Sequence, residues 1–435
     1  MINHKNAKDF LCKYVNKDGY DLVLDLKKSQ GLWLCDSQHN RKFLDFFGFF
    51  ATAPLGLNHP GMFEKRFLEE LKWASINKVT NSDIYTVEMA RFMEEFAKIV
   101  PSYMTHFFFI EGGALAVENA LKASFDWKIR KNFAKGQKKE TGTKIIHLKE
   151  AFHGRSGYTL SLTNTFDENK TKYYPKFEWP RVTNPKMTFP LNKQRTESVK
   201  ALERKSLDEI QDAINRYPDD IACLIIEPIQ GEGGDNHFRE EYFKSLREIT
   251  RKNDIMLIVD EIQSGMGITG KWWAFQHFGI EPDFIAFGKK LQVCGMAAGP
   301  KIDEIKENVF NVSSRINSTW GGNIADMVRG KRYIEIINED KIMDNVNKSG
   351  EYLLKRLNDL AEEHPSFFSN PRGRGLMCAI DIRDTKTRDL YEKEIFKNGL
   401  LVLKCGEKGI RFRPPLIIKK EEIDTGFKIL EKAMI

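Results

Sequence analysis

Residues Ile255–Gly295 read IMLIVDEIQSGMGITGKWWAFQHFGIEPDFIAFGKKLQVCG, and this stretch decides the fold. It contains two short apolar runs, Ile255–Val259 and Phe284–Phe287, in which β-branched and aromatic residues do not alternate with polar ones. Such runs are typical of strands that are buried on both faces of a sheet. The residues between the runs suffice for about one crossover connection. The stretch therefore predicts two neighbouring strands of a mostly parallel sheet.

Polar residues stand at the end of each predicted strand. The first run ends in Asp260, and the second is followed by Gly288, Lys289 and Lys290. Because ligands of such sheets bind beyond the carboxyl ends of the strands, we expect Asp260 and a lysine to share one crevice. The two groups could form an ordinary salt bridge. They also match pyridoxal phosphate, whose aldehyde needs a lysine and whose pyridinium nitrogen needs a carboxylate. These residues alone leave both interpretations open.

The composition is ordinary for a soluble protein. The 435 residues are 41% hydrophobic and 30% charged, which is ordinary for a globular protein and long enough for two domains. The net charge of +7 is small for this length, and we interpret the basic run Lys128–Lys144 as a solvated helix end and loop. We therefore expect no nucleic-acid partner.

The cysteines and the apolar segments indicate a cytoplasmic location. None of the six cysteines forms a CxxC pair or clusters with histidines, which argues against a metal site and a disulfide framework. The first ten residues lack the apolar centre of a signal peptide. The most apolar early stretch, Phe43–Leu57, is short and contains Asp45, so we expect no membrane span.

Outward from the central stretch, the N-terminal half predicts alternating strands and helices. Gly31–Asp45 has the pattern of a hairpin, an aromatic-rich loop covers Phe46–Pro60, and residues 61–100 have helical spacing. A buried strand, Phe107–Ile110, then runs through Glu111-Gly112-Gly113-Ala114 into a helix. A strand, a glycine turn and a helix N-terminus can bind a phosphate, although a tight turn explains two glycines equally well.

Further buried strands over Lys144–Leu148 and Ile221–Ile226 extend the alternation across residues 105–290, which indicates an α/β fold. After residue 295 the pattern changes to helices over 324–363, a strand starting at Gly373, short strands near 400–412 and a closing helix. We predict three parts: residues 1–60 form an N-terminal segment that joins the smaller domain and carries an active-site or interface loop, 61–323 form the large cofactor-binding domain, and 324–435 form a small α+β domain.

Seven motifs in order along the chain resemble those of the class III, fold-type I, pyridoxal-phosphate-dependent aminotransferases. They are FFFIEGGALAVENALKASFDWK, FHGRSGYTLSLTNT, IIEPIQGEGGD, IVDEIQSGMGITG, PDFIAFGKKLQVCG, NSTWGGN and RFRPPL. The resemblance covers nearly the whole chain and implies a fold with a mostly parallel central sheet in a large domain. Within the family, EGGALAVENALK and GKKLQVCG are similar to the wording of the lysine ε-aminotransferases.

The resemblance implies a set of cofactor contacts. Lys289 corresponds to the Schiff-base lysine and Asp260 to the partner of the pyridinium nitrogen, whereas Lys290 is expected to be structural. This sequence has Glu111 and Ala114 where the family commonly has Asn and Thr, so a hydroxyl contact to the phosphate is missing. The expected cofactor-binding residues are Gly113, Ala114, Phe152 (stacked on the ring), His153, Asp260, Gln263 (on the ring hydroxyl), Lys289 and Thr319, which in this family reaches across from the partner subunit.

The resemblance also implies L-lysine and 2-oxoglutarate as substrates, L-glutamate as a product, and a homodimer with shared active sites. Arg155 corresponds to the residue that holds the distal carboxylate, and Arg411 to the residue that holds the proximal carboxylate of 2-oxoglutarate. Glu232 corresponds to a switch that masks Arg411 while lysine reacts. Asn317 is expected to lie near the substrate.

Other functions compatible with these residues are ornithine or 4-aminobutyrate transamination, an aminomutase, and a cofactor-binding protein without catalysis. The presence of Lys289, Asp260 and Arg411 argues against the last. A substrate panel separates the others.

Overall fold

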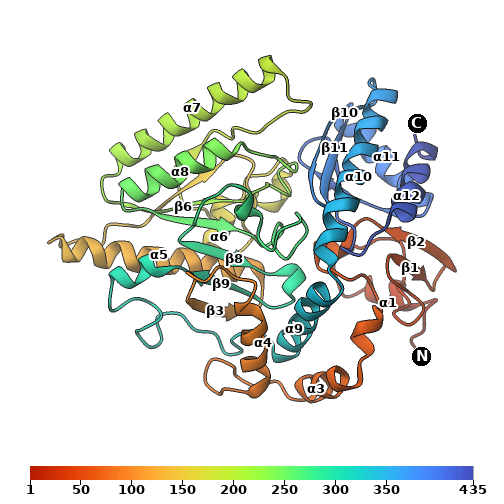
Figure 1. Ribbon diagram of the computed structural model, residues 1–435, viewed down its shortest axis with the longest axis horizontal. Coiled ribbons are helices and arrows are strands. Elements are labelled where there is room, and N and C mark those ends of the chain that lie inside the picture. The colour runs from red at the N-terminus through yellow and green to blue at the C-terminus, as the bar shows by residue number, and fades with distance from the viewer. Residues whose placement is uncertain (435) are drawn as a thin grey trace.

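A computed structural model describes residues 1–434, and Figure 1 shows a large sheet with helices on both faces beside a smaller part that contains both ends of the chain. The strand order in the large sheet is β3-β9-β8-β7-β6-β4-β5. Strands β8, β7, β6, β4 and β5 are mutually parallel, and β9 runs antiparallel to both β8 and β3. The strands are β3 (His106–Ile110), β4 (Lys144–Leu148), β5 (Arg181–Val182), β6 (Ile221–Ile226), β7 (Met256–Asp260), β8 (Phe284–Phe287) and β9 (Cys294–Ala298).

The two apolar runs that predicted the sheet are neighbours in it. Ile258 of β7 pairs with Phe284 of β8, and Asp260 pairs with Ala286. Every residue of β6, β7 and β8 is buried, which explains why the runs do not alternate. The prediction of a mostly parallel α/β sheet is confirmed, with β9 as an antiparallel strand that the sequence analysis did not identify.

Helices cover the sheet on both faces. Leu257 and Val259 of β7 belong to a core cluster that includes Tyr242 and Leu246 of α8 (Glu240–Lys252). The alternate β7 residues pack instead in a cluster with Leu121 and Trp127 of α5 (Gly113–Ala134). Further helices of this part are α3 (Lys65–Ile76), α4 (Val87–Ala97), α6 (Gly157–Leu162) and α7 (Lys193–Arg216), which packs on α8.

The C-terminal part contains a four-stranded sheet in the order β10-β11-β14-β13. Residues 368–382 form an antiparallel hairpin of two strands, where we expected one strand that began at Gly373. Gly375 has a φ of +55°, and this left-handed conformation makes the tight turn possible. The elements are α9 (Ile324–Glu339), α10 (Ile342–Glu363), β10 (Phe368–Arg374), β11 (Met377–Ile382), α11 (Thr385–Lys397), β12 (Leu400–Leu401), β13 (Leu403–Cys405), β14 (Gly409–Phe412) and α12 (Lys420–Lys432).

The N-terminal segment packs against the C-terminal part, as the red and blue ribbons in Figure 1 show. After α1 (Ala7–Leu11), the predicted hairpin forms from β1 (Trp33–Asp36) and β2 (Arg41–Asp45), and β2 also pairs in parallel with β12. A short left-handed turn follows at α2 (Gly48–Ala51), where all four residues have a φ between +52° and +64°. The boundaries between domains stay a prediction.

No helix among residues 1–434 combines the length and the apolar character that crossing a membrane requires.

Candidate active site

A cavity of about 490 Å³ lies at the carboxyl ends of β4, β6, β7 and β8. This is the edge of a parallel sheet at which ligands bind. It brings together side chains that are far apart in the sequence. Its lining consists of Phe50, Gly113, Ala114, Phe152, His153, Gly154, Arg155, Lys170, Glu227, Glu232, Asp260, Ile262, Gln263, Lys289, Cys294 and Arg411.

Lys289 projects its amine into this cavity from a turn that directly follows β8. Its φ of +49° is left-handed, and its Nζ donates a hydrogen bond to the carbonyl of Phe50 at 3.0 Å. Burial, followed by repulsion from the Arg411 guanidinium, lowers the pKa of Lys289 to about 8. About a tenth of this amine is therefore uncharged at pH 7, far more than for an ordinary lysine, and the uncharged form is the nucleophile.

Lys290 has a different environment. Its side chain is buried, and its Nζ donates to the carbonyl of Gln263 at 2.7 Å without lining the cavity. The backbone here forms the 3₁₀ turn η4 (Lys289–Leu291), which directs the two lysine side chains to different surroundings. The separation of the two lysines is the one that we expected.

Asp260 and Glu227 end the adjacent strands β7 and β6. Asp260 is 5% exposed, and its Oδ2 lies 2.8 Å from Nδ1 of His153, which is itself buried. The Glu227 carboxylate accepts hydrogen bonds from the backbone N–H groups of Phe152 and Gly231, at 2.9 and 3.0 Å. Burial raises the pKa of Glu227 to about 7. Through its two hydrogen bonds, Glu227 holds the loop that carries Phe152 and His153 over the cavity.

The N-terminus of α5 forms a cradle at one end of the cavity. Gly112, with a φ of +100°, precedes the helix and provides no side-chain cap, so the first N–H groups of α5 remain open to an anion. A Cβ on Gly154 would lie 2.6 Å from the Cβ of Ala114, which shows how closely the two loops approach. An amine, a buried carboxylate, an aromatic ring and this cradle are the groups that pyridoxal phosphate requires, and they fit it here.

Arg411 and Glu232 both line the cavity, where they form an ion pair. Arg411 on β14 is 2% exposed, and its Nη2 lies 2.5 Å from Oε2 of Glu232. The other oxygen of Glu232 contacts Nζ of Lys170. Burial opposes the charged form of Glu232, but Arg411 and Lys170 outweigh it and lower its pKa to about 2. The carboxylate is therefore ionised and holds two cations.

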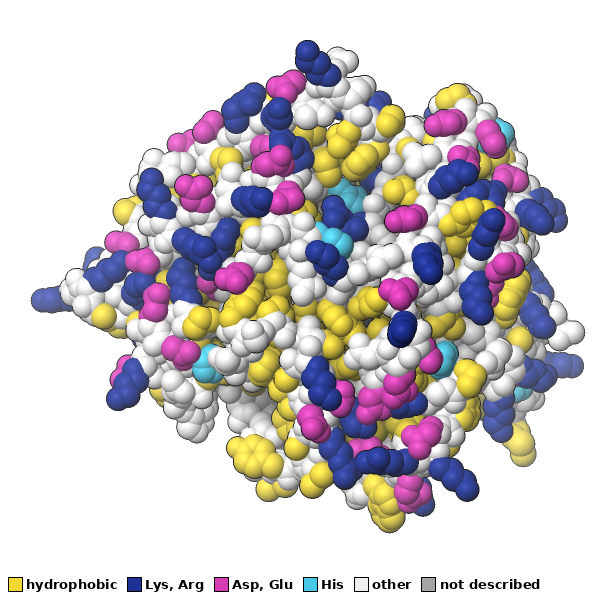
Figure 2. All heavy atoms as spheres, viewed as in Figure 1, with side chains coloured by type: hydrophobic (Ala, Val, Ile, Leu, Met, Phe, Trp, Pro, Cys, Tyr) yellow, Lys and Arg dark blue, Asp and Glu magenta, His cyan; other side chains and the backbone are white. Residues whose placement is uncertain are grey.

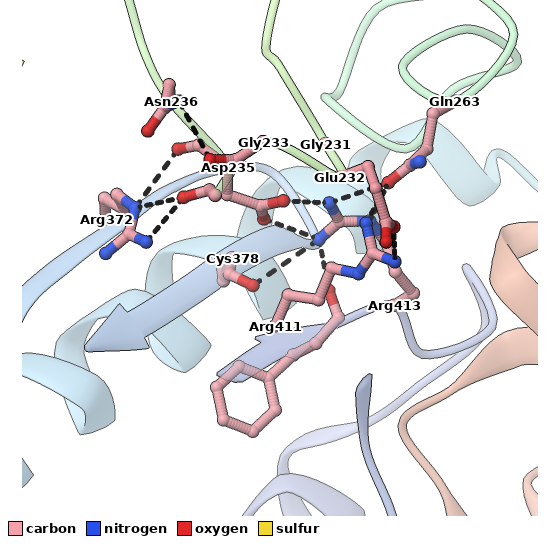
Figure 3. A network of polar contacts seen from close by, with 12 residues as sticks. Gly231, Glu232, Gly233, Asp235, Asn236, Gln263, Arg372, Cys378, Arg411 and Arg413 are labelled. Carbon is pink, nitrogen blue, oxygen red and sulfur yellow. Dashed lines mark hydrogen bonds and ion pairs between the residues drawn. The ribbon is translucent and has the colours of Figure 1, made fainter. Parts of the chain in front are cut away.

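A second arginine, Arg413, joins Arg411 in the network of polar contacts that Figure 3 shows. Arg413 makes a bidentate pair with Asp235, at 2.5 and 2.8 Å, and both side chains are fully buried. Oε1 of Gln263 accepts from Arg411 at 3.3 Å and from Arg413 at 3.1 Å. Arg413 thus fixes the side chain of Gln263, which we expected to contact the cofactor.

The remaining predicted residues differ in their placement. Arg155 is exposed at the cavity and makes no hydrogen bond or ion pair with another residue in the part of the chain that the structure describes. Asn317 and Thr319 are exposed and lie outside the lining of the cavity. Their loop packs on residues 81–82, where Ser82 donates to the carbonyl of Ser318 at 2.6 Å. The expected role of Thr319 in a partner subunit's site stays a prediction.

The sequence analysis did not predict six residues of the lining: Phe50, Gly154, Lys170, Glu227, Ile262 and Cys294. Glu227 directly follows β6 and Asp260 is the last residue of β7, so the same argument from strand ends could have identified Glu227. Lys170 lies in η2 (Glu168–Lys170), and no sequence signal separated it from the other lysines of the chain.

Comparison with known proteins gives a consistent result. Residues 14–434 match the family "Aminotransferase class-III". The chain therefore belongs to the class III aminotransferases.

Within this class, the chain is 46% identical to the L-lysine-epsilon aminotransferase of Amycolatopsis lactamdurans over 99% of its own length and 96% of that protein. The lysine aminotransferase of Mycobacterium tuberculosis, solved in the internal aldimine form, superimposes with a TM-score of 0.97 at 46% identity, over 99% of each chain. Mouse mitochondrial 4-aminobutyrate aminotransferase is 31% identical over 96% of this chain and 83% of that protein.

Proposed function

We propose that this protein transfers the ε-amino group of L-lysine to 2-oxoglutarate. The products are 2-aminoadipate 6-semialdehyde, which cyclises to piperideine-6-carboxylate, and L-glutamate. The full-length similarity to lysine ε-aminotransferases supports this reaction. The observation that carries it is the arrangement of charge around Lys289: Arg155, which has no ion-pair partner among residues 1–434, and a second arginine, Arg411, that Glu232 neutralises.

Pyridoxal phosphate is the cofactor that this site would hold, and when bound it supplies an electron sink for the amino-bearing carbon. Lys289 would attach it, Asp260 would keep its ring nitrogen protonated, and Phe152 would pack on its face. The N–H groups of α5 at Gly113 and Ala114 would bind its phosphate.

Charge explains how lysine would be oriented. L-lysine must present its ε-amine to the reacting centre and place its α-carboxylate at a distance, and Arg155 is the exposed cation that can bind this carboxylate. While Glu232 occupies Arg411, the cavity lining that the structure describes offers no free cation beside Lys289 to attract the carboxylate to the wrong end. Lys289, with its lowered pKa, is then the group that takes and returns the proton.

2-Oxoglutarate has two carboxylates and therefore needs both arginines. Its distal carboxylate can use Arg155, while the carboxylate beside the keto group needs Arg411. Glu232 must leave Arg411 before this second contact forms. The same pocket can thus accept a monocarboxylate amine donor and a dicarboxylate acceptor in turn, provided that Glu232 exchanges partners.

We further propose a homodimer whose partner subunit completes the site. Phe50 lines the cavity and is yet 51% exposed, so the cavity opens beside apolar surface. Figure 2 shows hydrophobic side chains exposed on the lower part of this face. Exposed apolar residues include Trp73, Ile76, Ile84, Tyr85, Val87 and Trp320, and Trp320 adjoins Thr319. Patches of this kind are typical of interfaces.

A cytoplasmic location is also part of the proposal.

Product analysis tests the reaction. Purified protein is incubated with L-lysine, 2-oxoglutarate and pyridoxal phosphate, glutamate is quantified, and the cyclic product is identified by mass and NMR. A ring with the carboxylate on the saturated carbon, formed one for one with glutamate, supports removal of the ε-amine. A ring with the carboxylate on the imine carbon contradicts the assigned roles of Arg155, Glu232 and Arg411.

Ornithine and 4-aminobutyrate are the alternative donors within the class. A 4-aminobutyrate aminotransferase matches most of the chain at lower identity, and ornithine is the alternative that the sequence motifs leave open. Each is tested in place of lysine under the same conditions, with glutamate as the readout. Faster turnover with ornithine or 4-aminobutyrate than with lysine would identify that amine as the substrate, and the chemical role of Lys289 would be unchanged.

A further inference from the structure

Lys170 is a second cation on Glu232 that the proposed reaction does not use. Its Nζ contacts Oε1 of Glu232, while Arg411 contacts Oε2, so the carboxylate bridges the two cations. The side chains of Lys170 and Glu232 are 21% and 20% exposed, whereas Arg411 is 2% exposed. One cation therefore lies at the mouth of the cavity and the other in its wall.

The partners of Arg411 explain why Glu232 needs a second cationic partner. Apart from Glu232, the Arg411 side chain donates only to Gln263, at 3.3 Å, and its Nε has no partner among the described residues. When a dicarboxylate displaces Glu232 from Arg411, the incoming carboxylate satisfies the arginine. The displaced Glu232 would then be a largely buried anion without a cation, which is costly.

We propose that Lys170 is a positioning residue for dicarboxylate binding: it receives Glu232 when a dicarboxylate takes Arg411. This inference rests on the proposed function only in naming 2-oxoglutarate as that dicarboxylate. Lys170 acts in both states of the exchange. While Arg411 is masked, Lys170 shares the charge of Glu232 and weakens its hold on the arginine. Once Arg411 is released, Lys170 keeps Glu232 paired at the mouth of the cavity.

The position of Lys170 suits this exchange. It ends the short turn η2, at the cavity mouth, and its Nζ lies 5.9 Å from the centre of the Phe152 ring. Its other acidic neighbour, Asp167, is 3.7 Å away and half exposed, so solvent weakens that pair. Glu232 is thus the partner that orients the amine toward the site.

Ligand binding by the holoenzyme tests the inference without turnover. Glutarate has two carboxylates and no keto group, and pentanoate is a matched acid with one carboxylate. The affinities of both are measured by calorimetry at fixed ionic strength for the wild type and for Lys170→Met. We expect Lys170→Met to weaken glutarate binding roughly five- to tenfold, as suits one charge-assisted pair at a partly exposed site, and to leave pentanoate binding unchanged.

Two further variants separate this role from simple attraction. Lys172→Met removes the same charge from an exposed side chain two residues away and should leave both affinities unchanged. In a Glu232→Gln background, Lys170→Met should have no further effect on glutarate, because Lys170 acts through Glu232. Circular dichroism confirms that each variant is folded.

Three results would overturn the inference. Unchanged glutarate binding in Lys170→Met would show that Lys170 has no part in the exchange. Equal loss of glutarate and pentanoate would assign it a general electrostatic effect. Loss of glutarate binding that persists in the Glu232→Gln background would mean that Lys170 contacts the ligand itself. If instead the protein fails to transaminate lysine while the glutarate results hold, the proposed donor is wrong and the role of Lys170 stands.

Discussion

The substitution Glu232→Gln should change which amino group of lysine reacts. Glutamine keeps the size of the side chain and removes the charge that masks Arg411. The pKa of Glu232 falls from 4.5 to about 2, because Arg411 and Lys170 outweigh the effect of burial. This shift corresponds to about 3 kcal/mol of net stabilisation of the carboxylate. Because burial opposes this shift, the two cations together supply more than the net figure, and half of it, about 1.5 kcal/mol or about tenfold in preference, is a lower bound for Arg411.

The assay is the ratio of the two cyclic products from lysine, distinguished by NMR. We expect the fraction formed by loss of the α-amine to rise about tenfold in Glu232→Gln, together with faster reaction of glutamate as a donor. Glu168→Gln is the matched control, because it removes an exposed negative charge near Lys170 and should leave the ratio unchanged. A folded, cofactor-loaded Glu232→Gln enzyme with the wild-type product ratio would refute the masking of Arg411.

Three other predictions concern buried ionisable groups. Since the pKa of Lys289 is lowered to about 8, the rate at which pyridoxal phosphate attaches to the apo-protein should increase as pH rises, with a midpoint near pH 8. Lys289→Ala should abolish both the absorbance of the attached cofactor and turnover. The pKa of Glu227 is raised from 4.5 to about 7, so the folded state binds one more proton than the unfolded state between these pH values. The free energy of unfolding should therefore fall by up to about 3 kcal/mol as pH rises from 4.5 to 7. Glu227→Gln should flatten this dependence on pH, as measured by urea titrations. Asp235→Asn leaves the Arg413 guanidinium buried without its charge partner, so it should lower the free energy of unfolding by about 3–5 kcal/mol, and a loss below 1 kcal/mol would contradict the importance of the pair.

The sequence predicted the sheet well where burial alone determines the pattern. Ile255–Val259 and Phe284–Phe287 are buried on both faces, so their apolar character identifies them without further context. The strand β9, which contains Gly295 and three small or flexible apolar residues, was missed because it carries no such signal. The hairpin of residues 368–382 was predicted only as a strand that starts at Gly373, because the turn at Gly375 depends on a single left-handed residue.

The site was predictable where a residue lies at the end of a strand or in a recognisable motif. Asp260 and Lys289 follow from the first argument, and Arg411 and Glu232 from the second. Lys170 and Phe50 could not be predicted, because their place at the cavity depends on how loops fold back over more than 60 and 230 residues of chain, respectively. Such contacts leave no periodic pattern in the sequence.

The pairing of β2 with β12 imposes an order on assembly during synthesis. Leu44 pairs with Leu400, so β2 has no partner on that edge until almost the whole chain has been made. During this time Phe43, Phe46 and Phe47, which are buried in the folded protein, remain uncovered beside an open strand edge. The left-handed turn that directs the Phe50 carbonyl toward Lys289 belongs to the same segment. The nascent chain therefore has to protect Phe43, Phe46 and Phe47 until β12 is made, and only then can the environment of Lys289 be completed.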